Sequence, residues 1–460
     1  MNKRTRLIIL LVCVVLFLLI APLLVAYSMG YRFDFEKMKV VATGGIYVRT
    51  FPAAGQIIID SNISEKPGLF ANSIFVQSLL PKNHTVSIKK DGYYDYFKTL
   101  PVQENQVTKI ENVFLIKKLI TFSDVSDKID YFSISPNNQS IITASTDGKN
   151  TVLNYFSISN PQQKKTFSIA QTGNISDIKW TNDSSSALIE MKGVNNDFYY
   201  FFDSNAQKPT ATRLSYLDKN SQQISFSPQD SQIIYYIKDK KLYSAKGNSA
   251  LPIINNVISF KISGSDITWL SSKGTLYDSD LSGKLIAEIT SKDFAVDGQK
   301  TYDILFILQN TFLKENNTLF KLNQNTKIFE KFDVPLTDYK IITSSDNKNL
   351  IFWSSEKIYL YSLAGPEGYP KFNELFSGSQ INDCQWLNND YIIFTAGDKI
   401  IISEIDYRGN INAITFPEEL NVGSDKTLKT QKPQIFFVPQ DGKLYVLTQN
   451  TLLSSEKITP

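Results

Sequence analysis

Few residues of this 460-residue chain have both the side chains and the spacing that catalysis needs. His84 is the only histidine, so any Ser-His-Asp triad would have to use it. The chain contains neither a Gly-x-Ser-x-Gly nucleophile motif nor a glycine-rich phosphate-binding motif. A lone histidine with no carboxylate cluster near it in sequence favours a structural role. We therefore expect no catalytic residue, no enzymatic activity and no cofactor.

Two short polar segments resemble ligand-binding patterns without completing them. Residues 278–283 have the first three ligand positions and the glycine of an EF-hand calcium loop, but the twelfth position is Ile289. Residues 145–148 approximate the Asp-box of sialidases and lack the usual residue between aspartate and glycine. Two cysteines far apart, Cys13 and Cys384, exclude a disulfide framework and a cysteine-based zinc site. We expect polar turns here and no metal.

The N-terminus predicts a membrane anchor. Residues 7–26 are uncharged and apolar, and twenty residues at about 1.5 Å each span about 30 Å, the thickness of the hydrocarbon core. Lys3, Arg4 and Arg6 precede this run, whereas the charges that follow it nearly cancel. This excess of basic charge predicts a cytoplasmic N-terminus in the plasma membrane and an extracytoplasmic remainder. A cleaved signal peptide is the alternative, although its apolar core is normally shorter and ends in a small-x-small site.

The segments then follow in order along the chain. Residues 1–6 are expected to be a cytoplasmic tail, residues 7–27 a transmembrane signal anchor and residues 28–43 a linker. Residues 44–117 read as short strands separated by turn residues, and the run from His84 to Lys90 alternates as a strand with one solvated face does. The sequence therefore predicts a small β domain directly after the linker.

This β domain resembles the PEGA domain. The residues that carry the resemblance are Pro52, Asp60, Pro67, His84, Lys90, Gly92 and Tyr93. The resemblance implies a small β-sandwich-like module of bacterial and archaeal cell-envelope proteins, in which these residues are structural. The family has no known chemistry and is associated with surface display and binding.

Residues 118–455 repeat a pattern of strand, polar turn and strand, and residues 456–460 form a tail. Copies begin at Ile129, Ile175, Ile224, Ile258, Phe294, Tyr339, Ile381 and Lys432. Their spacing of roughly 35–50 residues is typical of four-stranded propeller blades, and the turns look like those of WD40-like and TolB-like propellers. We expect an all-β chain with a β-propeller of eight blades. Seven blades, or a stacked array of β-sandwiches, are the alternatives.

The charge balance narrows the class of partner. A net charge of +3 over this length does not favour nucleic-acid binding. We expect a single-pass envelope protein whose propeller binds a protein or glycan partner without catalysis. One alternative is a glycan-active enzyme that uses carboxylates at a propeller rim, and another is an accessory or scaffold of an envelope assembly or transport machine.

Overall fold

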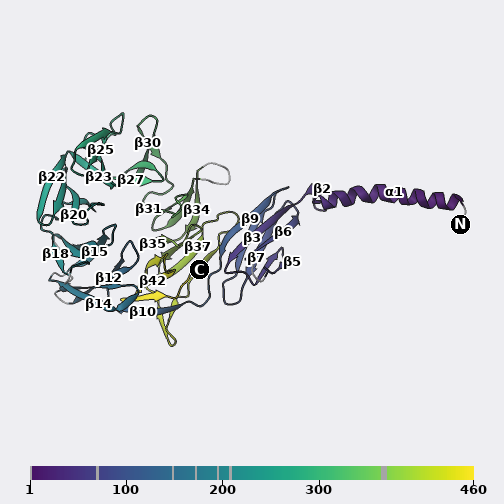
Figure 1. Cartoon of the computed structure of the whole chain (residues 1–460), viewed down its shortest axis with the longest axis horizontal. Coiled ribbons are helices and arrows are strands. Elements are labelled where there is room, and N and C mark those ends of the chain that lie inside the picture. The colour runs from purple at the N-terminus through teal and green to yellow at the C-terminus, as the bar shows by residue number, and fades with distance from the viewer. Residues whose placement is uncertain are drawn as a thin grey trace.

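The computed structural model describes residues 3–68, 72–147, 150–170, 173–193, 196–206, 210–363 and 370–459. Its first element is α1 (Lys3–Ser28), which extends away from the rest of the molecule (Figure 1). The most apolar 18-residue window within Thr5–Ser28 has a mean hydropathy of 3.5, and none of that window is buried against the protein. At about 1.5 Å per residue, α1 is long and apolar enough to cross a membrane. It is the one such helix in the described part of the chain.

A hairpin follows the helix, in the segment expected to be a linker. Strands β1 (Tyr31–Asp34) and β2 (Lys39–Ala42) pair antiparallel, with Phe33 opposite Val40. Gly30, with a φ of 88°, turns the chain out of the helix, and its carbonyl oxygen accepts a hydrogen bond from the Thr43 N–H at 3.0 Å. The chain between the helix and the β domain is therefore ordered on both sides of the hairpin.

The small β domain has two sheets that face each other. One has the order β6 (Ser73–Leu79), β3 (Gly44–Phe51), β9 (Val107–Phe114), with β3 and β9 parallel. The other has the order β5 (Ile63–Glu65), β4 (Gln56–Ile59), β7 (Asn83–Lys89), β8 (Tyr96–Pro101). Alternate apolar side chains from both sheets form a single buried core, as in a β-sandwich; among them are Ile46, Val48, Ile57, Ile59, Val86 and Ile88.

Beyond residue 120 the chain folds into a β-propeller of successive four-stranded blades (Figure 1). Blade 1 contains β11 (Tyr131–Ile134), β12 (Ser140–Asp147), β13 (Asn150–Ser157) and β14 (Asn160–Ile169). Blade 2 contains β15 (Asn174–Trp180), β16 (Ser186–Lys192), β17 (Asp197–Asp203) and β18 (Ala211–Arg213). Blade 3 contains β19 (Gln222–Phe226), β20 (Ile233–Lys238), β21 (Lys241–Lys246) and β22 (Ser249–Asn255). Blade 4 contains β23 (Val257–Ser263), β24 (Asp266–Ser271), β25 (Leu276–Asp280) and β26 (Leu285–Glu288).

The next three blades repeat this meander. Blade 5 contains β27 (Tyr302–Ile307), β28 (Asn310–Glu315), β29 (Thr318–Leu322) and β30 (Phe329–Phe332). Blade 6 contains β31 (Lys340–Thr343), β32 (Asn349–Trp353), β33 (Lys357–Ser362) and β34 (Lys371–Ser377). Blade 7 contains β35 (Ile381–Trp386), β36 (Tyr391–Ala396), β37 (Lys399–Glu404) and β38 (Ala413–Thr415).

The last blade closes the ring with strands from both ends of the propeller. Strands β41 (Gln434–Val438), β42 (Lys443–Thr448) and β43 (Thr451–Ser455) pair in order, and β10 (Thr121–Asp127) adds antiparallel to β43. A further hairpin, β39 (Glu419–Val422) and β40 (Lys426–Lys429), extends this sheet, with β39 parallel to β10. Across the described residues there are thus eight blades, as predicted, and not seven.

Each seam between neighbouring blades has its own hydrophobic core. The seam that closes the ring packs Ile129, Phe132 and Phe156 of blade 1 and its entry loop against Val438 and Leu447 of blade 8. Burying these side chains stabilises the ring by about 25 cal/mol per Å² of apolar surface removed from water. Because blade 8 contains strands from the two ends of the propeller, opening the ring would expose this seam and break the pairing of β10 with β43.

Candidate functional site

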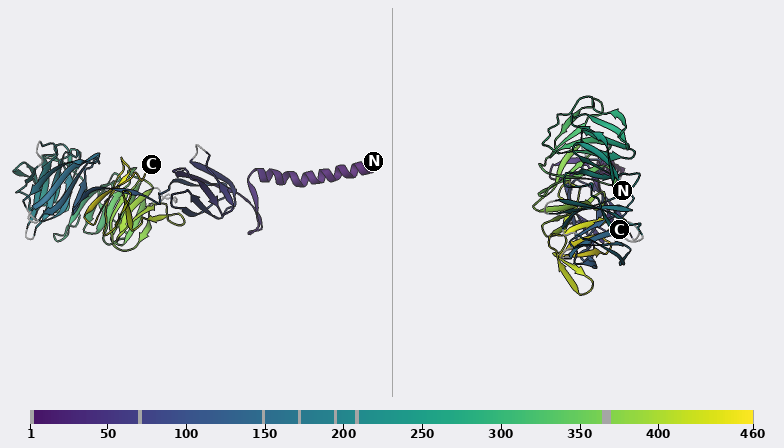
Figure 2. Two further views of the ribbon diagram at one scale, coloured as in Figure 1. Left: turned by 90° about the horizontal axis from the view of Figure 1, so that it is seen from below. Right: turned by 90° about the vertical axis from the view of Figure 1, so that its left-hand side faces the viewer.

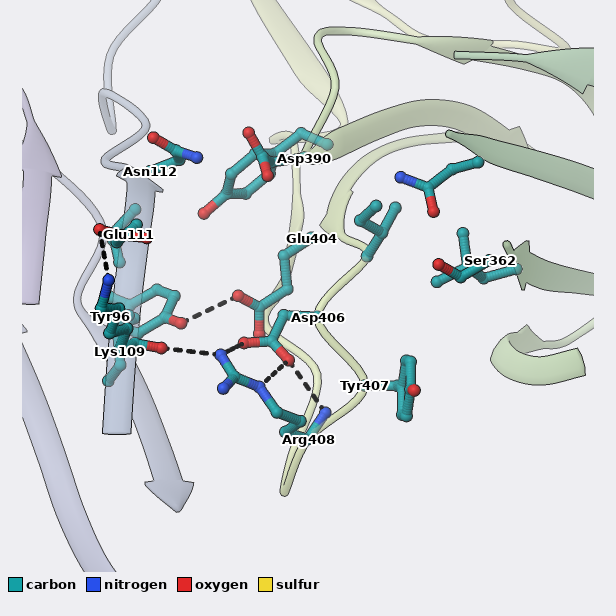
Figure 3. A pocket seen from close by; sticks show the side chains of 16 residues that line it. Tyr96, Lys109, Glu111, Asn112, Ser362, Asp390, Glu404, Asp406, Tyr407 and Arg408 are labelled. Carbon is teal, nitrogen blue, oxygen red and sulfur yellow. Dashed lines mark hydrogen bonds and ion pairs between the residues drawn. The ribbon is translucent and has the colours of Figure 1, made fainter. Parts of the chain in front are cut away.

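A cleft of about 410 Å³ lies where the small β domain meets the propeller (Figure 3). Its walls come from β8 and β9 on one side and from blades 6 and 7 on the other. Tyr96, Asp390, Glu404, Asp406 and Arg408 are among the side chains that line it. Charged and phenolic groups from distant parts of the sequence thus meet at one place, which makes this the first place to test for chemistry.

Lys98 forms the centre of the junction. In β8, the buried residues Tyr96, Lys98 and Leu100 alternate with exposed Phe97 and half-buried Thr99, so that the lysine side chain points inward and has no exposed surface. Its Nζ lies 2.6 Å from Glu404 Oε1, 2.6 Å from the Asp406 carbonyl oxygen and 3.1 Å from the Asn410 carbonyl oxygen. An ammonium group has three donors, and all three are satisfied here.

Glu404, the last residue of β37, receives donors from both domains. The Tyr96 hydroxyl donates to Oε2 at 2.9 Å, and Asn412 donates to Oε1 through its backbone N–H and its side-chain amide, both at 2.9 Å. Burial raises the pKa of Tyr96, and the negative charge of Glu404 raises that pKa further. The phenol therefore stays protonated and continues to donate its hydrogen bond.

Arg408 and Asp406 form a second ion pair at the mouth of the cleft. Arg408 donates through Nε and Nη2 to the two carboxylate oxygens of Asp406, at 2.9 and 2.8 Å, and through Nη2 to the Lys109 carbonyl oxygen at 2.9 Å (Figure 3). Burial alone would raise the pKa of Asp406. The hydrogen bonds from Arg408 and the charge of Lys98 outweigh that effect and hold this pKa below its usual value.

The loop between β37 and β38 also binds the backbone of β8. Asn410 Nδ2 donates to the Phe97 carbonyl oxygen at 2.6 Å, and Asn410 Oδ1 accepts from the Thr99 N–H at 3.0 Å. Asn412 Oδ1 accepts from the Phe97 N–H at 3.1 Å. The two amide side chains take the place of a neighbouring strand along the edge of β8. Gly409, with a φ of 65°, brings the loop so close that a Cβ there would collide with the Thr99 carbonyl oxygen.

The other wall of the cleft joins β3 and β9 to blade 7. Asn112 has a φ of 70° and lies where the register of β3 and β9 shifts; Arg49 Nη2 donates to its Oδ1 at 2.6 Å. The Tyr391 hydroxyl accepts a hydrogen bond from the Phe114 N–H at 3.0 Å. Burial raises the pKa of Asp390, and a hydrogen bond from Asn112 offsets part of that rise. The two domains are therefore joined by polar contacts on both walls of the cleft.

The chemistry of the cleft is that of a junction. Glu404 and Asp406 each accept several hydrogen bonds from cationic or amide donors, which leaves few lone pairs for a substrate. Breaking one partner of such a buried pair is costly, because the other charge is left without compensation. This arrangement holds the small β domain and the propeller in one relative orientation.

The residues predicted to carry the resemblance lie inside the small β domain and away from this cleft. The His84 ring contacts the Asp60 carboxylate through Nδ1 and the Leu80 carbonyl oxygen through Nε2, at 2.7 Å for the latter. Asp60 also accepts from the Thr85 N–H at 2.9 Å. The structure thus brings Asp60 and His84 together and leaves the histidine buried.

The remaining predicted residues are spread over turns and the anchor. Lys90 donates to the Ala53 carbonyl oxygen at 2.7 Å and lies over the ring of Tyr93, whereas Gly92 has a φ of 81° in the turn between them. Pro52 follows the end of β3, and Pro67 is half-buried in the loop after β5. Lys3, Arg4 and Arg6 all lie in the first turns of α1.

The two segments that resemble ligand loops are a turn and a loop only partly described. Asp280 Oδ1 accepts from the Ser282 N–H and the Lys284 N–H, both at 2.9 Å, as in a polar turn between β25 and β26. In the segment 145–148, Gly148 lies outside the described residues. Across the part of the chain that the structure describes, no three His, Cys, Asp or Glu side chains gather as a metal site would require.

The sequence did not lead us to predict that these junction residues meet. Lys98 occupies a position where the alternation of β8 calls for an apolar side chain, and this was the available signal. Glu404 lies 306 residues further along the chain, so nothing local identifies it as the partner.

The comparison with known families bears on the small β domain. Residues 43–117 match the family model of the PEGA domain. The predicted resemblance over residues 44–117 is thereby confirmed. No curated protein sequence matches the chain.

Solved structures similar to this chain are β-propellers. The Dos1 propeller is 11% identical with a TM-score of 0.44, and the match covers 74% of this chain and 95% of that one. BamB from Moraxella catarrhalis is 11% identical with a TM-score of 0.44, covering 73% and 99%. Kluyveromyces lactis Hsv2 is 11% identical with a TM-score of 0.38, covering 64% and 100%.

Proposed function

We propose that this chain is a membrane-anchored, outward-facing envelope protein that presents its propeller to a partner protein and performs no catalysis. In this proposal α1 is an uncleaved anchor with its N-terminus in the cytoplasm. The PEGA domain spaces the propeller from the membrane and fixes its orientation. The propeller then acts as a rigid frame on which the loops and edges of the blades meet other molecules.

The observation that carries this proposal is an exposed apolar edge on the propeller. Strand β26 is the outermost strand of blade 4, and all four of its residues are exposed, including Leu285 at 56% and Ile286 at 58%. Leu251 on β22, the outermost strand of blade 3, is 66% exposed. A strand edge with free backbone groups and apolar side chains is a surface to which another protein adds a strand or an apolar segment.

The position of this edge supports the same proposal. Figure 1 shows β22 and β25 at the end of the molecule opposite α1, with the PEGA domain between the propeller and the helix. In the left view of Figure 2, which looks from below, the helix, the PEGA domain and the propeller follow one another in a row. The outer strand of blade 3, which carries Leu251, therefore lies on the side of the propeller away from α1, where a partner can reach it.

Topology is tested first, by protease treatment of intact cells and of right-side-out vesicles, with a tag at the C-terminus. We expect external protease to remove the tag and to leave a membrane-bound N-terminal fragment. A tag that stays protected until the membrane is opened would place the propeller in the cytoplasm and overturn the proposal.

The partner surface is tested by site-specific photo-crosslinking in the cells that make the protein. A benzoylphenylalanine at position 286 should give a discrete protein adduct that the Leu285→Asp substitution abolishes. The matched control is position 331 on β30, the outermost strand of blade 5, where Lys331 is 64% exposed on its side chain. Equal labelling at positions 286 and 331, or an adduct insensitive to Leu285→Asp, would contradict a partner site on β26.

A further inference from the structure

We infer that the β1–β2 hairpin is a membrane-interface element: its apolar face lies in the headgroup region of the outer leaflet and sets the angle at which the PEGA domain leaves the membrane. This inference rests on the proposed role of α1 as an anchor. It adds a second contact with the lipid that the anchor alone does not imply.

The hairpin has two chemically different faces. Tyr31, Phe33 and Val40 share one face and are 40%, 42% and 60% exposed, and Phe35 and Met38 in the turn are 79% and 73% exposed. On the opposite face Asp34 and Val41 are each 3% exposed, whereas Arg32 is half-buried and Lys39 is exposed. Glu36 and Lys37 are also exposed in the turn, but five exposed apolar side chains on one short hairpin form a patch of the kind that marks a binding surface.

The membrane in which α1 is proposed to lie would cover this apolar face. The apolar face begins at Tyr31, three residues after α1 ends at Ser28, so it lies at the level where a spanning helix leaves the hydrocarbon. Aromatic side chains are enriched at this level, because their apolar bodies and polar edges suit the headgroup region. The Phe33 and Phe35 rings pack edge to face with centroids 5.0 Å apart, which forms one compact aromatic surface.

The orientation of the hairpin suits this role. In the left view of Figure 2 the chain that follows α1 runs across the end of the helix rather than continuing along its axis. Arg32 holds this angle: its Nη1 donates to the Tyr27 carbonyl oxygen at 2.7 Å and its Nη2 to Ser78 Oγ at 3.1 Å. The guanidinium also lies 3.5 Å from the centroid of the Tyr27 ring.

The hairpin is tied to the PEGA domain at its other end as well. Glu36 pairs with Lys82 at 3.2 Å, and Lys37 donates to the Pro81 carbonyl oxygen at 3.4 Å. Asp34 accepts from the Glu36 N–H and the Lys37 N–H, which shapes the turn and presents Phe35 and Met38 outward. Binding of the hairpin to the membrane surface would therefore also fix the orientation of the PEGA domain.

The test uses the full chain, reconstituted into vesicles of phosphatidylcholine and phosphatidylglycerol, with a tryptophan at the tip of the hairpin. Phe35→Trp should show blue-shifted emission and strong quenching when part of the phosphatidylcholine carries bromine on its acyl chains. The four natural tryptophans all lie in the propeller, and the spectrum of the unsubstituted chain is subtracted. The matched control is Phe97→Trp: Phe97 is 49% exposed on β8 beside the propeller, far from the lipid.

The outcomes separate this inference from the anchor proposal. Quenching several-fold greater in the Phe35→Trp variant than in the Phe97→Trp variant supports the inference, and Met38→Trp should behave like Phe35→Trp if the latter fails to fold. Equal, weak quenching of the tryptophans introduced at positions 35, 38 and 97, in a chain that resists alkaline extraction, overturns the interfacial hairpin alone. Release of the chain by alkaline extraction overturns the anchor itself.

Discussion

The ammonium group of Lys98 in the PEGA domain lies 2.6 Å from the carboxylate of Glu404 in blade 7, and the lysine has no exposed surface. The contact joins residues 306 positions apart in the chain. A buried ion pair contributes little net stability compared with an apolar pair of the same shape, but the loss of one partner is costly. The junction therefore depends on both residues being present, and this dependence leads to the first prediction.

Lys98→Ala should destabilise the protein by about 3–5 kcal/mol, because Glu404 would remain buried without its cation. The double variant Lys98→Met with Glu404→Leu should recover much of that loss, since it removes both charges. Lys331→Ala is the matched control, because Lys331 and Asp333 form an exposed pair whose side chains are 64% and 84% exposed. Urea unfolding of the detergent-solubilised protein measures the free energy of unfolding of all three variants. A change within about 0.5 kcal/mol for Lys98→Ala would refute the role given to the pair.

Gly409→Ala should loosen the junction, because the added Cβ would collide with the Thr99 carbonyl oxygen. Gly423→Ala is a close control: φ is 64° at position 423 and 65° at position 409, but a Cβ at 423 meets nothing within 4 Å. Both variants carry the same backbone cost of about 1 kcal/mol, so the difference between them reports the contact alone. Faster amide hydrogen exchange in β8 is expected for Gly409→Ala. Similar exchange in the two variants would count against close docking at this loop.

Asp60 should make the stability of the PEGA domain sensitive to acid. Burial alone would raise the pKa of Asp60, but hydrogen bonds from the Thr85 N–H and from His84 outweigh it and lower this pKa below its usual value. A carboxyl group with a lowered pKa stabilises the fold above its unfolded pKa of about 4, and that contribution is lost as the pH falls through the folded value.

The Asp60→Asn variant should therefore be less stable than the natural chain at neutral pH and should lose less stability on acidification. Denaturant unfolding as a function of pH measures this, and Asp91→Asn, at an exposed position of the same domain, is the control. Parallel stability curves for the natural chain and Asp60→Asn would argue against the Asp60–His84 contact.

Asp383 in blade 7 should give stability a pH dependence opposite to that of Asp60. Burial raises its pKa to about 6, although Gln385 and backbone N–H groups donate hydrogen bonds to it. A carboxyl group with a raised pKa favours the fold fully below its unfolded pKa, and that contribution is lost as the pH rises through about 6. This difference between the folded and unfolded pKa values lowers the free energy of unfolding by at most about 3 kcal/mol at neutral pH.

Asp383→Asn should accordingly raise the melting temperature at pH values above about 7 and change it little at pH values near 4. Asp333→Asn, at a side chain that is 84% exposed, provides the control. Thermal unfolding across this pH range measures the effect. A lower melting temperature of Asp383→Asn above pH 7 would contradict this prediction. It would mean that the hydrogen bonds of the Asp383 carboxylate stabilise the seam between blades 7 and 8 by more than the burial of its charge destabilises it.

The sequence by itself determined the features that depend on local pattern. The apolar run at residues 7–26 predicted α1, because its length alone matches a membrane. The alternation from His84 to Lys90 predicted β7, and the repeated strand–turn–strand copies predicted the number of blades. These signals repeat within a few residues or at a fixed spacing, so they can be read without knowing which segments meet.

Only the tertiary structure decided which residues join the domains and where the chain turns. The partner of Lys98 cannot be read locally, because the pairing forms only when blade 7 is packed beside β8. The segment at residues 28–43 was expected to be a linker, since strands of four residues with interspersed charges give a weak periodic signal. Its order comes from Arg32, whose hydrogen bonds to Tyr27 and Ser78 link the helix end to the PEGA domain, and from the burial of Val41, both of which exist only in the folded chain.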